Sequence, residues 1–201
     1  MIRAEDRQGA RLLILDRADK ANALTRDMLA ALDTAVARAA ADGISVLILT
    51  GAGKVFSAGA DLDGMAQGLG SAPEWEVLSA RIAAYPGLTI AALNGTLAGG
   101  AFGMALACDL RAAVARAEFF YPVMKRGYLP QPSDPRRLAA LVGPSRARRI
   151  LLAGERITAD MALDWGLLDA IGEDAVATAL GLAADALGAD PGHVRRMKAM
   201  F

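Results

Sequence analysis

Short apolar runs that alternate with a helical pattern constrain the fold of this chain more than any other feature. Four runs rich in aliphatic residues are bounded by Gly, Pro, Asp or Asn, which is typical of buried strands: residues 11–15, 45–50, 88–93 and 110–114. Between the first two, apolar residues recur at helical spacing, with Thr25 placed to cap a helix and Gly43 placed to end it. This alternation favours parallel strands with crossover helices, so the sequence predicts an α/β fold.

The last third of the chain has a different character, because helical patterns follow one another with only Gly and Pro between them. Helices are predicted over residues 134–142, 145–153, 159–165 and 174–187. A chain of 201 residues can bury one sizeable core. We therefore expect a single domain over residues 1–201, with a core over about 1–130 and a helical tail over about 131–201.

Composition excludes several classes of function. The 22 basic and 22 acidic residues balance, and neither sign forms a long run, so nucleic acid is not an expected partner. With Cys108 as the only cysteine and His193 as the only histidine, no Cys/His metal site is predicted, and His193 is interpreted as a residue of a helix start or the surface. The N-terminus lacks an apolar segment and no run approaches the roughly 20 residues that span a bilayer, so we expect a cytoplasmic protein without membrane contact.

Two glycine-rich stretches follow predicted strands, at residues 51–62 and 94–110. Neither matches the glycine motifs that bind nucleotide phosphates. Small residues can bring backbone N–H groups close to a ligand, and a helix that starts near Gly99 would add the positive end of its dipole. Such a site suits a developing oxyanion. Alternatively, the glycines serve only tight turns and close helix packing.

Four sequence blocks, in order, are similar to blocks of the enoyl-CoA hydratase/isomerase (crotonase) superfamily. They are LDRADKANALT, GAGKVFSAGADL, PGLTIAALNGTLAGG and LLAGERITADMALDWGLLDAI. The resemblance covers nearly the whole chain and implies a crotonase/ClpP-like spiral of ββα units. It also implies a homo-oligomer, trimer or hexamer, and a shortened C-terminal helical tail, because family members usually continue beyond the position of Phe201.

The same resemblance implies which residues bind the substrate. The N–H groups of Ala60 and Gly100 would polarise the carbonyl of an acyl-CoA thioester and stabilise its enolate. Coenzyme A would be part of the substrate, with no bound cofactor or metal. It would lie near Lys20, Ala21 and Ala58 and along the backbone of Asp61 and Leu62, although Lys20 is equally well explained as a solvated loop lysine. Asn94, Cys108 and Asp109 also match the family and are interpreted as structural.

The sequence departs from the family at the two positions where hydratases carry glutamates, which here are Gly103 and Val123. Neither can transfer a proton, so ordinary hydration lacks its acid and its base. The segment 119–138, which forms the wall of the acyl pocket in the family, offers six polar replacements: Tyr121, Lys125, Tyr128, Gln131, Ser133 and Asp134.

Tyr128 and Asp134 are the leading candidates for proton transfer among these six residues. The structural alternatives are a half-buried aromatic for Tyr128 and, for Asp134, the N-cap of a helix that has Pro135 at its first position. Glu74 and Glu76 are interpreted as surface carboxylates at the start of a helix.

Three hypotheses follow. The first is an acyl-CoA enzyme that needs the oxyanion hole but not the glutamates, with decarboxylation of a malonyl-type thioester favoured over isomerisation or hydrolysis. The second is an inactive acyl-CoA-binding or assembly subunit. The third, a serine peptidase, is disfavoured because the single histidine lies in the tail and no GxSxG motif is present.

Overall fold

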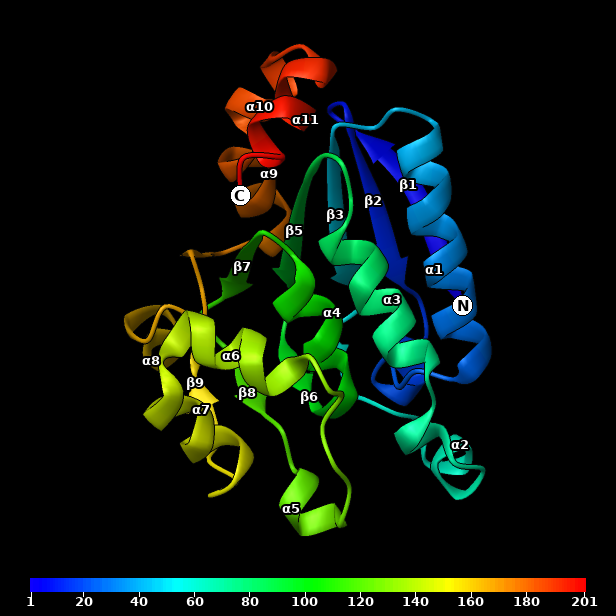
Figure 1. Ribbon diagram of the computed structural model, residues 1–201, viewed down its shortest axis with the longest axis vertical. Coiled ribbons are helices and arrows are strands. Elements are labelled where there is room, and N and C mark those ends of the chain that lie inside the picture. The colour runs from blue at the N-terminus through cyan, green and yellow to red at the C-terminus, as the bar shows by residue number, and fades with distance from the viewer.

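The computed structural model describes residues 1–201 as two β-sheets with surrounding helices (Figure 1). The larger sheet has the strand order β1-β2-β3-β5-β7-β10, and the smaller has the order β4-β6-β8-β9. The four predicted strands are confirmed as β2, β3, β5 and β7, and six more are present. The strands are β1 (Ile2–Arg7), β2 (Ala10–Leu15), β3 (Val46–Gly51), β4 (Val55–Ser57), β5 (Leu88–Leu93), β6 (Thr96–Ala98), β7 (Leu110–Val114), β8 (Glu118–Phe120), β9 (Ile157–Thr158) and β10 (Ala170–Gly172).

Successive strand pairs generate the spiral that the resemblance implied. In β3-β4, β5-β6 and β7-β8, the first strand joins the larger sheet and the second joins the smaller, and helical segments follow. All neighbouring strands pair in parallel except β1 with β2 and β8 with β9. The central strands are almost continuously apolar and buried, as parallel strands covered on both faces must be.

The helices surround these sheets, with α1, α3, α4 and α6 packed in succession and α9 packed against β5 and β7 (Figure 1). The helices are α1 (Arg26–Ala41), α2 (Leu62–Ala66), α3 (Glu74–Ala83), α4 (Phe102–Ala107), α5 (Val123–Arg126), α6 (Asp134–Val142), α7 (Pro144–Leu151), α8 (Ala159–Asp164), α9 (Ala175–Leu182), α10 (Ala184–Gly188) and α11 (Pro191–Lys198). Short 3₁₀ turns are η1 (Ala18–Lys20), η2 (Leu69–Ser71) and η3 (Gly99–Ala101). None of these helices has the length and apolar character that crossing a membrane requires.

The predicted helix ends are partly confirmed. Thr25 caps α1, because its side chain accepts a hydrogen bond from the N–H of Met28 at 3.2 Å, and Gly43 follows the helix at φ +78°. The single helix predicted over 174–187 is wrong: Ala183, at φ −89° and ψ −1°, separates α9 from α10. No proline lies near Ala183, so the Ala-rich sequence predicts one continuous helix where the structure has two. The tail also contributes β9 and β10, which tie it to both sheets.

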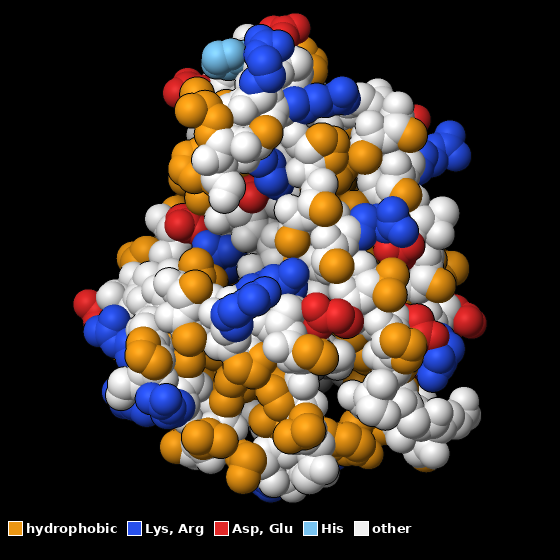
Figure 2. All heavy atoms as spheres, viewed as in Figure 1, with side chains coloured by type: hydrophobic (Ala, Val, Ile, Leu, Met, Phe, Trp, Pro, Cys, Tyr) orange, Lys and Arg blue, Asp and Glu red, His pale blue; other side chains and the backbone are white.

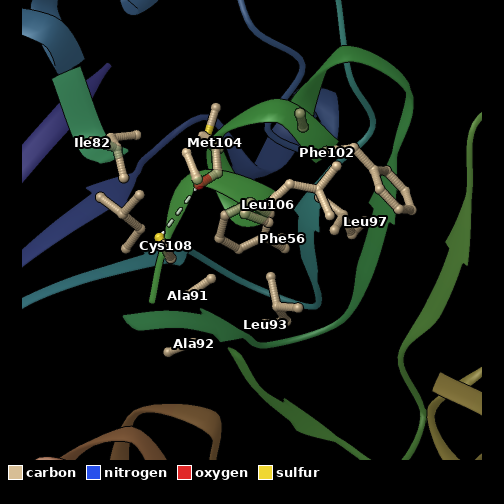
Figure 3. Packing of buried hydrophobic residues seen from close by; sticks show 14 of the residues in the cluster. Phe56, Ile82, Ala91, Ala92, Leu93, Leu97, Phe102, Met104, Leu106 and Cys108 are labelled. Atoms are coloured by element: carbon tan, nitrogen blue, oxygen red, sulfur yellow. Dashed lines mark hydrogen bonds between the residues drawn. The ribbon is translucent and has the colours of Figure 1, made fainter. Parts of the chain in front are cut away.

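Helix α4 lies inside the core. All six of its residues are buried, and Figure 3 shows Phe102, Met104 and Leu106 of this helix close to Phe56 and to the strand residues around Leu93. The side chains of Phe56 and Phe102 have no exposed surface. Close packing on every side fixes the position of α4 and of the glycine-rich turn that leads into it.

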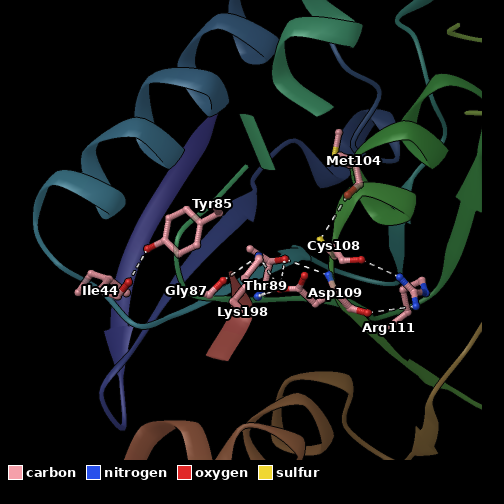
Figure 4. Close-up of polar contacts among 9 residues, drawn as sticks. All are labelled: Ile44, Tyr85, Gly87, Thr89, Met104, Cys108, Asp109, Arg111 and Lys198. Atoms are coloured by element: carbon pink, nitrogen blue, oxygen red, sulfur yellow. Dashed lines mark hydrogen bonds and ion pairs between the residues drawn. The ribbon is translucent and has the colours of Figure 1, made fainter. Parts of the chain in front are cut away.

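A polar network joins strands β5 and β7 to the last helix (Figure 4). Oδ2 of Asp109 accepts hydrogen bonds from the N–H of Thr89 at 2.8 Å, from its hydroxyl at 2.9 Å, and from Nζ of Lys198 at 2.7 Å. The neighbouring Cys108 is buried, burial raises the pKa of its thiol to about 12, and the guanidinium of Arg111 donates to its carbonyl at 2.8 Å. These contacts agree with the structural interpretation of Cys108 and Asp109.

Candidate active site

The two glycine-rich stretches border one cavity of about 330 Å³. Its lining includes five of the predicted site residues, namely Ala58, Ala60, Leu62, Gly100 and Tyr128. On the face of the molecule seen in Figure 2, hydrophobic side chains gather in the lower part, over α5 and toward α2. The cavity is thus apolar in most of its wall, with a few polar groups and backbone N–H groups, as ligand sites usually are.

Ala60 is held by hydrogen bonds of its neighbours rather than by its own N–H. The N–H of Leu24 donates to the carbonyl of Gly59 at 2.8 Å, and the N–H of Asp61 donates to the carbonyl of Leu24 at 2.9 Å. The Ala60 N–H itself donates none of the hydrogen bonds of the loops and caps. This donor therefore lies at the cavity wall without an internal acceptor.

Gly100 lies in η3, directly before the buried helix α4. It is the second residue of this turn, and the first N–H groups of a helix have no acceptor within the helix. A Cβ at Gly59, which has φ +93°, would lie 2.9 Å from the carbonyl oxygen of Ala98, so the two glycine-rich stretches touch and only glycine fits there. The close approach brings the cavity-lining residues Ala60 and Gly100 to neighbouring segments of the chain.

Trp75 leaves little room for a side chain at position 100. A Cβ at Gly100 would lie 3.3 Å from the indole ring of Trp75, which is only 3% exposed and donates its Nε1–H to the carbonyl of Leu69 at 2.8 Å. A larger side chain at Gly100 would therefore disturb the cavity wall as well as the N–H. The sequence did not identify Trp75 as a wall residue, because an aromatic at helical spacing also fits the core.

The residues expected near coenzyme A have unequal roles. The side chain of Asp61 has a structural role, because it pairs with Arg17 at 2.6 Å and caps α2 by accepting from the N–H of Gly64 at 3.2 Å. The hydrogen bond from Arg17, followed by that from Gly64, lowers the pKa of Asp61. Leu62 is 70% exposed at the cavity edge, whereas Lys20 is exposed at the end of η1, outside the lining. Ala21 accepts from the N–H of Ala58 at 2.9 Å, and it stands in the left-handed region at φ +49°.

The structural interpretation of Asp134 as a helix N-cap is wrong. Helix α6 begins at Asp134 itself; the preceding Ser133 has α-helical dihedral angles and makes no side-chain capping bond. The carboxylate of Asp134 is fully buried, and its Oδ2 accepts a hydrogen bond from the hydroxyl of Tyr121 at 2.9 Å. The other oxygen, Oδ1, is buried without any partner. A capping carboxylate would instead accept backbone N–H groups of the first turn.

Asp134 fills the space beside the glycine that replaces the first family glutamate. A Cβ at Gly103 would lie 3.0 Å from Oδ1 of Asp134. A carboxylate from α6 therefore reaches the place where a side chain at position 103 of α4 would begin. The glycine at position 103 and the buried carboxylate of Asp134 therefore fit each other, because the carboxylate lies where a side chain at position 103 would begin.

Charges around Asp134 come from two helices. Glu76 lies in the first turn of α3, as interpreted from the sequence, and it also accepts from the hydroxyl of Ser133 at 3.0 Å. Arg137 of α6 donates to the same hydroxyl at 2.8 Å. Burial raises the pKa of Asp134 to about 7; the hydrogen bond from Tyr121 opposes that rise, Glu76 adds to it and Arg137 opposes it. Glu74, by contrast, pairs with Arg26 at the partly exposed start of α3.

The raised pKa of Asp134 predicts a pH dependence of stability. Its ordinary pKa is 3.8, so between about pH 4 and 7 the folded chain holds a proton that the unfolded chain has lost. The contribution of the protonated form is complete below pH 4 and declines as the pH rises through 7. Relative to Asp134→Asn, the parent should lose up to about 1.4 kcal/mol of unfolding free energy per pH unit in this interval. Urea unfolding of both proteins from pH 4.5 to 8 measures this, and parallel curves would contradict the assignment.

The two tyrosines of the cavity wall differ in their surroundings. Tyr128 is 40% exposed, and its hydroxyl has no hydrogen-bond partner. Tyr121 is 3% exposed; it stacks on Phe102 with ring centroids 5.4 Å apart, and burial and the charge of Asp134 raise its pKa. The sequence favoured Tyr128 over Tyr121 as a proton-transfer residue. The position of Tyr121 at the end of a short apolar strand, before a proline, was the available sign that it points inward.

Comparisons with known proteins agree with this geometry. Residues 5–201 match the family model described as Enoyl-CoA hydratase/isomerase. The chain is 37% identical over 202 residues to "Probable enoyl-CoA hydratase echA6" of Mycobacterium leprae, covering 98% of this chain and 81% of the relative. It is 32% identical to 4-chlorobenzoyl coenzyme A dehalogenase-2 of an Arthrobacter species, covering 96% of this chain and 74% of the relative. The crystal structure of enoyl-CoA hydratase from Bacillus anthracis superposes with a TM-score of 0.93 at 28% identity, covering 98% of this chain and 81% of that one.

Proposed function

Because the chain belongs to the enoyl-CoA hydratase/isomerase family, we propose that it binds an acyl-CoA thioester and stabilises the thioester enolate between the N–H groups of Ala60 and Gly100. The observation that carries this proposal is the placement of both residues in the lining of one cavity, with the Ala60 N–H making none of the loop and cap hydrogen bonds and Gly100 at the start of a helical turn. Donors that need no rearrangement stabilise developing negative charge efficiently. The apolar wall provided by Met65, Trp75 and Val123 suits an acyl chain.

The reaction that we favour does not need a glutamate at position 103 or 123. Loss of CO2 from a malonyl-type thioester generates the enolate without a base, so the oxyanion hole supplies the main catalytic effect and one proton completes the reaction. Isomerisation or thioester hydrolysis are weaker variants that need a proton-transfer group from the cavity wall. Ordinary hydration of crotonyl-CoA should be negligible, because Gly103 and Val123 can act neither as acid nor as base.

Arg126 supports a substrate that carries a second negative charge. It lines the cavity and makes no ion pair with any carboxylate of the chain. A guanidinium at this wall could hold the carboxylate of a malonyl-type acyl group until CO2 leaves. The alternative function is that of an acyl-CoA-binding or assembly subunit without turnover, which would need no replacement for the glutamates.

The enzyme and the inactive subunit would both bind an acyl-CoA, so a binding measurement tests what the two functions have in common. Acetyl-CoA at a hundredfold excess over its dissociation constant should stabilise the fold by about 2.7 kcal/mol. For a chain of this size, that corresponds to a rise of about 5–10 °C in the melting temperature. Scanning fluorimetry with millimolar acetyl-CoA, and with AMP as a control for nonspecific nucleotide effects, measures it. An unchanged melting temperature would contradict the proposal.

Assembly and location extend the same proposal. We infer from the family a trimer or hexamer located in the cytoplasm. Multi-angle light scattering coupled to size exclusion measures the mass in solution, and a value of 20.8 kDa, that of one chain, would contradict the oligomer.

A further inference from the structure

We propose that Tyr121 and Asp134 form a proton relay to the carbon beside the thioester, with the hydroxyl of Tyr121 facing the substrate and Asp134 holding the proton behind it. The inference rests on the proposed function, since it needs an acyl-CoA in the cavity. It assigns the proton transfer to a buried pair rather than to the exposed Tyr128.

The position of Tyr121 fits the first role. Tyr121 lines the same cavity as Ala60 and Gly100, and its ring is stacked on Phe102 with an angle of 22° between the planes. Its hydroxyl lies 2.9 Å from Oδ2 of Asp134. The stacking and the hydrogen bond hold the hydroxyl in one place, as a group that transfers a proton to a bound substrate must be held.

The surroundings of Asp134 fit the second role. A carboxylate with a purely structural role would have both oxygens hydrogen-bonded, because burying an unpaired polar atom is costly. Oδ1 of Asp134 has no partner, although the side chain is fully buried. The absence of a side chain at Gly103 leaves the room that this oxygen occupies. A protonated carboxyl group tolerates these surroundings better than an ionised one, and the site can therefore store a proton.

The charged groups near Asp134 have opposite signs, and neither of them hydrogen-bonds to its carboxyl group. Glu76 and Arg137 face Asp134 from α3 and α6, and both are engaged by the hydroxyl of Ser133 rather than by the carboxyl of Asp134. From α4, the neighbour is Gly103, which carries no charge. Tyr121 is the only side chain that hydrogen-bonds to Asp134.

The proton movement balances in both directions. In enolate formation, the α C–H bond breaks and its electron pair moves into the enolate, whose oxygen is held by the two N–H groups. Oη of Tyr121 takes the α proton as it gives its own proton to the carboxylate of Asp134. In the reverse direction, which follows loss of CO2, Asp134 returns the proton to Oη and Tyr121 protonates the α carbon. Asp134 then regains a proton from water after the product leaves.

Deuterium exchange at the α carbon of acetoacetyl-CoA tests the relay without requiring a known reaction. The parent protein in D2O should exchange these hydrogens, with a rate that rises with pH as Asp134 loses its proton. Tyr121→Phe and Asp134→Asn should each exchange at least about 100-fold more slowly, and Asp134→Asn should lose the pH dependence. Binding of acetoacetyl-CoA, measured by calorimetry, should change by less than about threefold in both variants, since neither group supplies the oxyanion hole.

Tyr85→Phe is the matched control. Tyr85 is also a buried tyrosine, whose hydroxyl donates to the carbonyl of Ile44 at 2.8 Å, but it lies outside the cavity lining. Its loss should leave the exchange rate unchanged. Absence of acetoacetyl-CoA binding by the parent would overturn the proposed function. Binding without exchange by the parent, exchange at the parental rate in Tyr121→Phe or Asp134→Asn, or a loss of exchange in Tyr128→Phe alone would overturn the relay.

Discussion

Replacing Gly103 with glutamate is expected to destabilise the fold by more than about 4 kcal/mol, although it restores the residue type that hydratases carry there. The Cβ of the new side chain would lie 3.0 Å from Oδ1 of Asp134, inside a helix whose residues are all buried. A second carboxylate would then share a dry site with the first, and the added volume would push the two helices apart. Chemical denaturation of the variant measures the loss, and no gain of crotonyl-CoA hydration should accompany it.

A double variant separates this specific conflict from general damage to the core. Gly103→Glu combined with Asp134→Ala removes the buried carboxylate that the new side chain meets, and should recover much of the lost stability. Gly181→Glu is the control for a glycine-to-glutamate change in a helix: Gly181 lies exposed in α9, and a Cβ there meets nothing within 4 Å. Its effect should stay within about 0.5 kcal/mol. A Gly103→Glu variant as stable as the parent would show that the two positions do not compete for space.

Removal of the Ala60 N–H should lower any thioester turnover or α-carbon exchange by about 100- to 1000-fold, the usual cost of losing one oxyanion-hole donor. Ala60→Pro removes the donor while the hydrogen bonds made by the neighbouring Leu24 and Asp61 remain, because the Ala60 N–H contributes to neither. Position 60 is preferable to position 100, where a side chain meets Trp75. The measurement is exchange of acetoacetyl-CoA by protein whose melting temperature shows it to be folded.

Ala60→Gly is the matched control, since it changes the same side chain and keeps the N–H. Its exchange rate should stay within a few-fold of the parent. If folded Ala60→Pro and Ala60→Gly exchanged equally fast, the N–H of Ala60 would have no part in stabilising the enolate.

Much of the fold could be predicted because its signals are local. The apolar runs of β2, β3, β5 and β7, and the cap of α1 at Thr25, are properties of neighbouring residues. The three-residue strands β4, β6 and β8 were missed, because so few residues carry no clear period and their pairing is decided by partners distant in the sequence.

The candidate site also combines local features, which the sequence indicates, with contacts between distant elements, which it does not. The glycine-rich stretches have a local signature, whereas Ala60 and Gly100 were assigned from the family resemblance; both residues line one cavity. Asp134 was a candidate for proton transfer, but its complete burial could not be predicted, because an Asp before a proline is the local pattern of a helix cap. What directs its carboxylate inward is the hydroxyl of Tyr121 and the empty space at Gly103, and both come from other elements.

A crystal structure with acetoacetyl-CoA bound should show the thioester oxygen about 3 Å from the backbone nitrogens of both Ala60 and Gly100. The α carbon should lie within about 3.5 Å of Oη of Tyr121. A thioester whose oxygen points away from both nitrogens, or a ligand bound outside this cavity, would show that the oxyanion hole is not formed by Ala60 and Gly100.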